Sequence, residues 1–392
     1  MMTFRKTFLI TFLLVILLIS TFLGGFFLRE MLQSQNQIAN SFPVFSEAYD
    51  LLDKHGLKPL PTAPAVEYGM IRGMLQAYDE PHTSFLEPAQ TELETNSLSG
   101  KFGGIGTEIG VDPDGFRIFY PFADGPAAKA GIQEGDRLLA IDDMPVDNQT
   151  PFDSIVAAIR GNVGTQVNIT IGRSPDFEPI TYKVERAEIT LPSVTWHVDP
   201  SDSRVGIVGI NIIADTTPEE VKKAIHELQS REATHFILDL RNNSGGLLDA
   251  GVDIARLFLN DGDVIQQQFR DEEIKTSRVE KPGEFTAIPL AILVNNNTAS
   301  AAEIVAGALQ ARKRAILVGV PTYGKDTIQL VFTLKDNSSL HVTAAHWWIP
   351  GVKFPNEGYG LTPDIRVEEK PDDPNSLVSA AIKALLDPTT EN

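Results

Sequence analysis

The chain has 392 residues, of which 42% are hydrophobic and 22% charged, a composition typical of a globular protein with two or three domains and not of a disordered chain. Its formal net charge of −19 argues against nucleic acid as a partner, because phosphate binding requires clustered Lys and Arg. Cysteine is absent, which excludes disulfides, thiolate chemistry and cysteine-ligated metal.

The amino terminus predicts a membrane segment. Residues 7–28 contain no charged residue, and Arg5 and Lys6 precede them. A helix of this length spans a hydrocarbon core of about 30 Å, and the positive residues before it predict a cytoplasmic N-terminus with the rest of the chain outside. We expect an uncleaved signal anchor over residues 1–30 and a working part in the periplasm or at the cell exterior. A cleaved signal peptide with secretion is the alternative.

Residues 31–99 predict a helical module. A first helix has its apolar side chains on one face, and prolines separate it from a second apolar helix over residues 65–77. The turn of residues 79–88 ends the second helix, and we interpret its His82 as structural because it lies in a proline-flanked turn. The apolar face of the first helix is formed by Phe45, Ala48, Leu51 and Leu52.

Residues 100–188 predict a compact module of strands and short helices. The stretch FGGIGTEI places Gly103, Gly104 and Gly106 in a loop before a strand, where backbone N–H groups can turn toward one anion. For this loop alone, a tight hairpin is the alternative. The later elements are a helix ending at Gly131, a strand over residues 137–141, a helix over residues 152–159, and strands over residues 167–171 and 181–184.

This order of elements, together with the stretch DGPAAKAGIQEGDRLLAIDDMPV over residues 124–146, resembles a PDZ domain. The resemblance implies that Ile105, Gly106 and Thr107 form a carboxylate-binding loop. It also implies that the free C-terminus of a peptide adds as a strand beside this loop, with its last side chain in an apolar pocket. Scaffold packing without a ligand is the alternative.

Strands and helices alternate through the remainder of the chain, from residue 189 to residue 392, which predicts an α/β domain. One apolar run in this region stops at three asparagines before a helical pattern begins. Strands are expected over residues 205–210, 235–240, 290–294 and 315–318, and helices over residues 218–229, 247–258, 301–311 and 377–386.

Ser300 lies at the turn between a predicted strand and a predicted helix, near unpaired backbone N–H groups that could stabilise an oxyanion. Lys325, in the turn after the next strand, can supply the base that a serine nucleophile needs, and Gln329 follows it. Taken singly, each residue has a structural interpretation, as a helix N-cap, a solvated charge and an outward-facing strand residue. Together, at this spacing, they indicate a catalytic site.

The stretches TASAAEI and GKDTIQ resemble the S-A-S-A-S-E-I and G-K-G-x-x-Q patterns of the carboxyl-terminal processing peptidases, also called tail-specific proteases. The resemblance implies a nucleophile at Ser300, a general base at Lys325 and a lysine-orienting glutamine at Gln329. It also implies a crotonase-like spiral of ββα units for the catalytic domain, with supporting roles for Glu303 and Thr322. Three residues depart from the family pattern, namely Thr298, Ala302 and Asp326. The last of them puts a carboxylate beside the lysine, which would favour the charged amine.

The motif DLRNNSGG, residues 239–246, is similar to the D-L-R-x-N-x-G-G stretch of the same family. The resemblance implies that the Gly246 N–H and the Ala301 N–H form the oxyanion hole. Ser244 also imitates the nucleophile turn of trypsin-like proteases, so a Ser-His-Asp protease is an alternative. It is disfavoured because the PDZ-like module precedes Ser244, and because a strand and a helix flank this serine where two β-barrels would be needed.

We therefore predict a serine endopeptidase that recognises the C-terminal tails of protein or peptide substrates through its PDZ domain. A catalytically inactive PDZ adaptor on the same fold is the alternative from another class. The histidines show no metal-binding spacing, so neither a metal nor a cofactor is expected. The expected domains are a signal anchor (1–30), a helical module (31–99), an inserted PDZ domain (100–188) and a protease domain with a C-terminal helix (189–392).

Overall fold

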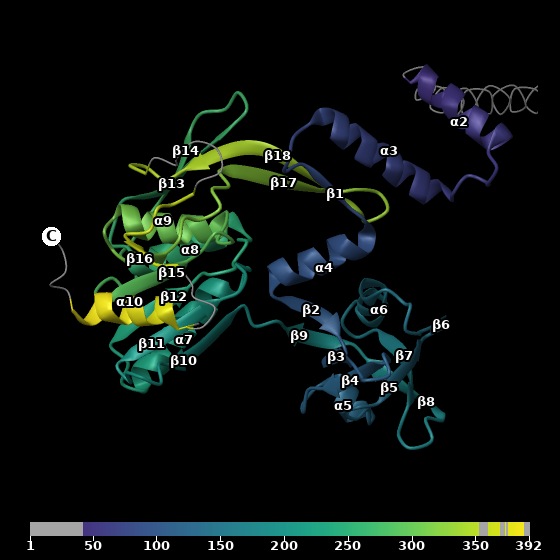
Figure 1. Cartoon of the computed structure of the whole chain (residues 1–392), viewed down its shortest axis with the longest axis horizontal. Helices are drawn as coiled ribbons and strands as arrows, with labels where there is room; N and C mark the ends of the chain where they lie inside the picture. The colour runs from purple at the N-terminus through teal and green to yellow at the C-terminus, as the bar shows by residue number, and fades with distance from the viewer. Residues whose placement is uncertain (1–41, 353–359, 369–372, 374, 388–392) are drawn as a thin grey trace, which may run out of the picture. The chain divides into compact units, whose positions relative to one another are not determined.

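The computed structural model describes residues 42–352, 360–368, 373 and 375–387 (Figure 1). The described part of the chain divides into two units between residues 74 and 75. The predicted signal anchor over residues 1–30 lies outside the described residues. Within the described ranges, no helix has both the length and the apolar character needed to cross a membrane.

Two helices lie where the sequence predicts them, α2 (Pro43–His55) and α3 (Ala63–Tyr78). Helix α2 begins with a proline, whose fixed φ and missing N–H suit the first helical position. Its apolar residues Leu51 and Leu52 are exposed, and neither helix buries a side chain among the described residues.

The PDZ-like region contains a sheet with strand order β3-β4-β5-β7-β8, in which β6 also pairs with β5 and all neighbours are antiparallel. Helix α5 ends at Gly131, whose φ of 105° confirms the predicted glycine stop. The core includes Phe119, Leu138 and Ile169, all almost fully buried. The bounds are β3 (Thr107–Val111), β4 (Arg117–Pro121), α5 (Pro126–Ala130), β5 (Arg137–Ile141), β6 (Met144–Pro145), α6 (Phe152–Ile159), β7 (Gln166–Gly172) and β8 (Pro179–Glu185).

Two further strands pair with each other, one before this sheet in the chain and one after it. Helix α4 (Pro88–Ser99) leads into β2 (Lys101–Gly104), which pairs with β9 (Ala187–Thr190). The prediction that Gly103 and Gly104 lie in a loop is wrong, because both are paired residues of β2. Close packing explains the glycine, since a Cβ on Gly103 would lie 2.0 Å from a backbone oxygen of Gly161.

The predicted α/β domain is built on a six-stranded sheet of order β10-β11-β12-β15-β16-β19. Strand β10 is antiparallel to β11, and the other neighbours are parallel. The strands are β10 (Val194–Val198), β11 (Val205–Ile210), β12 (His235–Asp239), β15 (Leu290–Val294), β16 (Ile316–Gly319) and β19 (Ile365–Arg366). The helices are α7 (Thr217–Ser230), α8 (Leu248–Phe258), α9 (Ala301–Ala311) and α10 (Ser376–Leu386).

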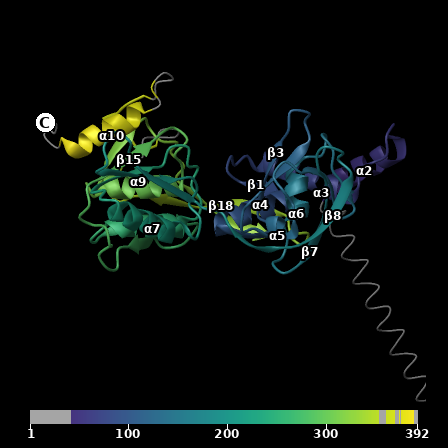
Figure 2. The same ribbon diagram turned by 90° about the horizontal axis from the view of Figure 1, so that it is seen from below.

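Both faces of this sheet are covered, as expected for parallel strands that read as continuous apolar runs. Alternate residues such as Leu238 and Ile292 pack against α7, α8 and α9. Their neighbours Ile237 and Leu293 pack in a separate cluster with α10. Figure 2 shows α10 on one side of β15 and α7 on the other. Because β12 and β15 are parallel neighbours, their carboxyl ends lie side by side. The predicted glycine turn begins at the end of β12, and the predicted serine turn at the end of β15.

A second sheet carries the predicted lysine turn. Its long strand β18 pairs with β1, β13 and β17, and β14 extends the sheet beyond β13. Lys325 lies two residues before β17, so the sheet fixes the start of the segment that carries it. The strands are β1 (Ser84–Leu86), β13 (Asp263–Phe269), β14 (Lys275–Arg278), β17 (Thr327–Thr333) and β18 (Ser339–Trp348).

Candidate active site

Ser300 lies in a strained turn between the fully buried strand β15 and helix α9. Its backbone has φ 54° and ψ −121°, a conformation that residues with a Cβ rarely adopt. Such strain persists only where surrounding contacts hold it. Here the Ser300 N–H donates to the Glu303 carboxylate at 2.9 Å, which ties the turn to the first turn of α9.

Glu303 connects the serine turn to the lysine turn. Its carboxylate is fully buried and accepts four hydrogen bonds from two separate segments of the chain. Burial raises the pKa of Glu303, and the four hydrogen bonds act in the opposite direction. The donors are the Ser300 N–H at 2.9 Å, the Thr322 hydroxyl at 2.6 Å, the Gly324 N–H at 2.7 Å and the Lys325 N–H at 3.0 Å.

The Lys325 amine donates a hydrogen bond to Gln329 Oε1 at 2.8 Å. Gln329 Nε2 donates in turn to the backbone carbonyl of His82, which fixes the direction of the amide. Burial lowers the pKa of Lys325, while the charges of Glu80 and Glu94 oppose this shift. The glutamine orients the amine, and burial shifts its ionisation toward the neutral form.

Ser300 and Lys325 line the same cavity, whose volume is about 310 Å³. Among the described residues, no hydrogen bond joins Ser300 Oγ to Lys325 Nζ. The structure thus places Ser300, Lys325, Gln329 and Gly246 in the lining of one cavity. Glu303 and Thr322 do not line it; both are buried and hydrogen-bonded to each other. The apolar lining includes Ile212, Leu247, Ile304, Ile328 and Trp347, and the further polar lining includes Glu94, Ser244, Thr327 and His341.

The turn after β12 brings glycine backbone against the serine. A Cβ on Gly245 would lie 2.9 Å from Ser300 Cβ and 3.0 Å from the Ala301 nitrogen, so only glycine permits this approach. Gly245 and Gly246 also have φ values of 103° and 146°, in the region that favours glycine. The hydrogen bonds within the described chain leave the N–H groups of Gly246 and Ala301 without an acceptor. Two free donors beside a serine are what an oxyanion hole requires.

Asn243 holds the glycine turn in place, which sequence reasoning missed. Its fully buried side chain donates to the Ile210 carbonyl at 2.8 Å and accepts the Gly245 N–H at 2.8 Å. Its own carbonyl accepts the Ala299 N–H at 2.9 Å, which joins the glycine turn to the serine turn. The motif contains this asparagine, but nothing in the sequence identifies Ile210 as its partner.

The competing nucleophile Ser244 also lines the cavity and is exposed. No hydrogen bond from a histidine or an aspartate to its side chain exists in the part of the chain that the structure describes. A β-strand and an α-helix flank it, as the sequence indicates, so the triad alternative has no structural support.

The PDZ-like region contains a second cavity, of about 850 Å³. Ile105, Gly106 and Thr107 line it from one side and residues Val156 and Ile159 of α6 from another. The N–H groups of Ile105 and Gly106 have no acceptor among the described residues. The loop and the helix therefore flank one groove, as the resemblance to a PDZ domain implies, and the peptide-binding role of the loop stays a prediction.

No group of three or more His, Asp or Glu side chains suited to a metal ion occurs in the described segments. The site combines a serine in a strained turn, two free backbone N–H groups and a partly buried lysine. On an α/β fold with a PDZ-like region, these features define the class of PDZ-containing serine peptidases.

Comparison with known proteins agrees with this class. Residues 204–367 match the model of peptidase family S41, and residues 123–173 match a PDZ domain. The chain belongs to the carboxyl-terminal processing proteases of this family. It is 34% identical over 305 residues to such a protease from Bartonella bacilliformis, with 76% of this chain and 69% of the relative covered. It is 37% identical over 319 residues to one from Picosynechococcus sp., with 80% and 76% covered.

A solved photosystem II D1 C-terminal processing protease is 29% identical to the chain. The superposition has a TM-score of 0.46 and covers 82% of this chain and 86% of that one. The two family models and the curated relatives show that the protein is a serine-type peptidase with a PDZ domain, as the sequence predicts.

Proposed function

We propose that the protein is an endopeptidase that hydrolyses peptide bonds with a Ser300–Lys325 dyad and recognises substrate C-termini through its PDZ domain. The observation that supports the dyad most strongly is that the serine, the partly buried lysine and Gly246 line one cavity, with the unpaired N–H groups of Gly246 and Ala301 beside the serine. The Lys325 amine forms no ion pair among the described residues and donates to the neutral Gln329 Oε1, so a structural salt bridge does not explain its position.

In the proposed reaction, neutral Lys325 takes the proton of Ser300 as Oγ attacks the carbonyl carbon of the substrate. The oxyanion accepts hydrogen bonds from the N–H groups of Gly246 and Ala301. The protonated lysine then gives its proton to the leaving amine, and water hydrolyses the acyl-enzyme by the same route. Proton transfer needs Nζ within about 2.6–3.2 Å of Oγ, a contact that often tightens only when substrate binds.

The lysine must be neutral at working pH for this reaction. Lowering its pKa from about 10.4 to near 7 or 8 requires roughly 3–5 kcal/mol, which burial in a cavity can supply. The structure supports this direction, because burial is the largest influence on the pKa of Lys325. Gln329 would hold the amine through Oε1 and leave its lone pair for the serine proton.

Tail recognition is proposed from the groove between residues 105–107 and helix α6. Free N–H groups at Ile105 and Gly106 can donate hydrogen bonds to a terminal carboxylate, and the apolar residues of α6 can contact the last side chain. We further infer that the catalytic sheet and its helices follow the ββα spiral of the crotonases. We also propose that residues 7–28 anchor the chain with its working part outside the cytoplasm; fractionation of cells that express the full-length chain tests this.

The experiment is turnover of an unfolded model protein by the full-length chain and by its Ser300→Ala and Lys325→Ala variants. We expect cleavage by the parent and a loss of at least a hundredfold in both variants. If both variants cleave like the parent, the dyad is wrong. If none of the three cleaves while tail peptides still bind, the adaptor alternative holds.

The adaptor alternative depends on two departures from the family pattern, Ala302 and Asp326, of which Asp326 places a charge beside the lysine. Its carboxylate lies 3.5 Å from His346 Nδ1 and is half exposed. It does not contribute to the pKa shift of Lys325, whose opposing charges are Glu80 and Glu94. The departure from the family pattern therefore leaves the lysine free to act.

A further inference from the structure

We propose that Asn242 and Asn295 form an amide clasp that positions the two halves of the oxyanion hole. The proposal rests on the proposed function above. It assigns positioning roles to two asparagines that do not touch the reacting atoms.

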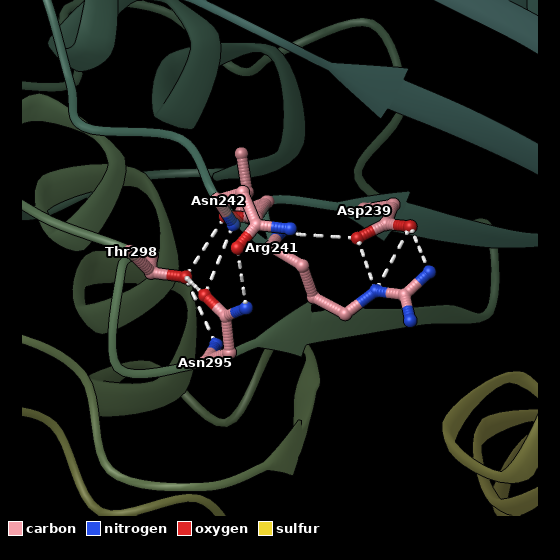
Figure 3. Close-up of polar contacts among 6 residues, drawn as sticks. Asp239, Arg241, Asn242, Asn295 and Thr298 are labelled. Atoms are coloured by element: carbon pink, nitrogen blue, oxygen red, sulfur yellow. Dashed lines mark hydrogen bonds and ion pairs between the residues drawn. The ribbon is translucent and has the colours of Figure 1, made fainter. Parts of the chain in front are cut away.

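The clasp consists of reciprocal hydrogen bonds between the two turns that carry the free N–H groups (Figure 3). The Asn242 N–H donates to Asn295 Oδ1 at 3.0 Å, and Asn295 Nδ2 donates back to Asn242 Oδ1 at 2.9 Å. Asn297 Nδ2 adds a third bond to Asn242 Oδ1 at 3.0 Å. Each amide group thus binds the opposite turn and not only its own.

The clasp lies at the outer end of a ladder that leads to the catalytic N–H groups. Thr298 Oγ1 donates to the Leu240 carbonyl at 2.8 Å, and the Ala299 N–H donates to the Asn243 carbonyl at 2.9 Å. Beyond this ladder lie Gly246 on one turn and Ala301 on the other. If the clasp opens, the two turns can separate, and the distance between the two donors is no longer fixed.

Local turn geometry explains only part of this arrangement. Asn295 Oδ1 also accepts the Asn297 N–H at 3.1 Å, which is an ordinary turn within its own segment. Asn242 has φ 59°, a conformation that asparagine tolerates better than most residues. Neither role requires the two side chains to bind each other. Arg241, which precedes Asn242, donates from Nη2 to Asp239 Oδ2 at 2.6 Å (Figure 3). This contact holds the start of the glycine turn independently of the clasp.

The hydrogen-bond directions give a test with matched charges. Asn242 Oδ1 acts only as an acceptor in the clasp, so Asn242→Asp retains both side-chain bonds that it receives. Asn295 must donate through Nδ2, so Asn295→Asp places a carboxylate oxygen against Asn242 Oδ1. Both variants are isosteric with asparagine and add one negative charge, so each controls for the size and charge of the other.

Steady-state kinetics of the full-length chain on an internally quenched peptide with a free C-terminus measures the effect. We expect kcat of Asn295→Asp and Asn295→Ala to fall about 10- to 50-fold with KM within twofold, less than the 10²–10³-fold typical of removing an oxyanion donor itself. Asn242→Asp should stay within threefold of the parent. Asn296→Ala, in the same turn but exposed and without a hydrogen-bond partner among the described residues, should not change kcat.

A double-mutant cycle separates a shared role from two unrelated ones. Asn242→Gly removes the side chain without strain at positive φ, and combined with Asn295→Ala it should lower kcat no more than the larger single effect. Multiplied losses, equal losses in the two aspartate variants, or an unchanged kcat in Asn295→Asp would each overturn the clasp. A parent chain without Ser300-dependent turnover would instead refute the proposed function, so the two failures are distinguishable.

Discussion

Replacement of Glu303 tests whether one buried carboxylate holds the serine turn and the lysine turn together. In Glu303→Gln, the best orientation keeps the amide oxygen at the position of Oε2, where it still accepts the N–H groups of Ser300 and Lys325. The amide NH₂ then occupies the position of Oε1, where it can donate to Thr322 Oγ1 but leaves the Gly324 N–H without an acceptor. One unsatisfied buried donor costs about 1–3 kcal/mol.

Glu303→Ala removes the acceptor from all three backbone N–H groups. At about 1–3 kcal/mol for each unsatisfied buried donor, reduced where water enters the space, the expected loss is roughly 3–6 kcal/mol, a large part of the 5–15 kcal/mol that stabilises a typical domain. Because the φ of 54° at Ser300 depends on this carboxylate, we also expect kcat to fall at least a hundredfold in the alanine variant and less than about tenfold in the glutamine variant.

Urea unfolding with kcat measured on the same preparations checks both expectations. The order of stability should be parent, then Glu303→Gln, then Glu303→Ala, with PDZ tail binding unchanged in all three. If the glutamine and alanine variants were equally stable and equally active, the carboxylate would not link the two turns, and the reasoning from its four hydrogen bonds would be refuted.

Three further predictions concern the lysine and the glycine turn. Because the proposed mechanism requires neutral Lys325 and the charge of Glu80 raises its pKa, Glu80→Gln should move the acid limb of the kcat/KM profile to lower pH; an unchanged limb would contradict the electrostatic role. Asp326→Gly should leave that limb in place, which the same titration measures. Gly245→Ala should abolish labelling of Ser300 by a fluorophosphonate because its Cβ would meet Ser300 Cβ at 2.9 Å, whereas Gly135→Ala, at φ 83° with open space around it, should label like the parent.

The sequence predicts elements best where an apolar run has clear ends. The predicted bounds of β11, β15 and α9 agree with the structure, because the strands are continuous apolar runs and the helix follows a polar turn. The loop predicted at Gly103 and Gly104 was wrong because a glycine needed for close packing in a strand looks the same as one needed for a turn.

The site was predictable only as a set of residue types. The spacing of Ser300, Lys325 and Gln329 pointed to one cavity, and all three residues line it. The carbonyl of His82 was not predictable as the partner of Gln329, because every residue has a backbone carbonyl and the two positions are 247 residues apart. His82 was interpreted as structural from its side chain, and its contribution to the site comes from its backbone.

The position of Asp326 shows why a departure from a family pattern can be tolerated beside the lysine that we propose as the general base. Successive residues of an extended chain point in opposite directions, so the side chain of Lys325 enters the cavity while that of Asp326 turns toward His346. The Asp326 carbonyl accepts the Trp347 N–H at 2.8 Å, which anchors the segment to the end of β18 and keeps this alternation in place. The charge therefore lies next to the lysine in sequence but outside its cavity, and the ionisation of the amine is governed by burial, Glu80 and Glu94.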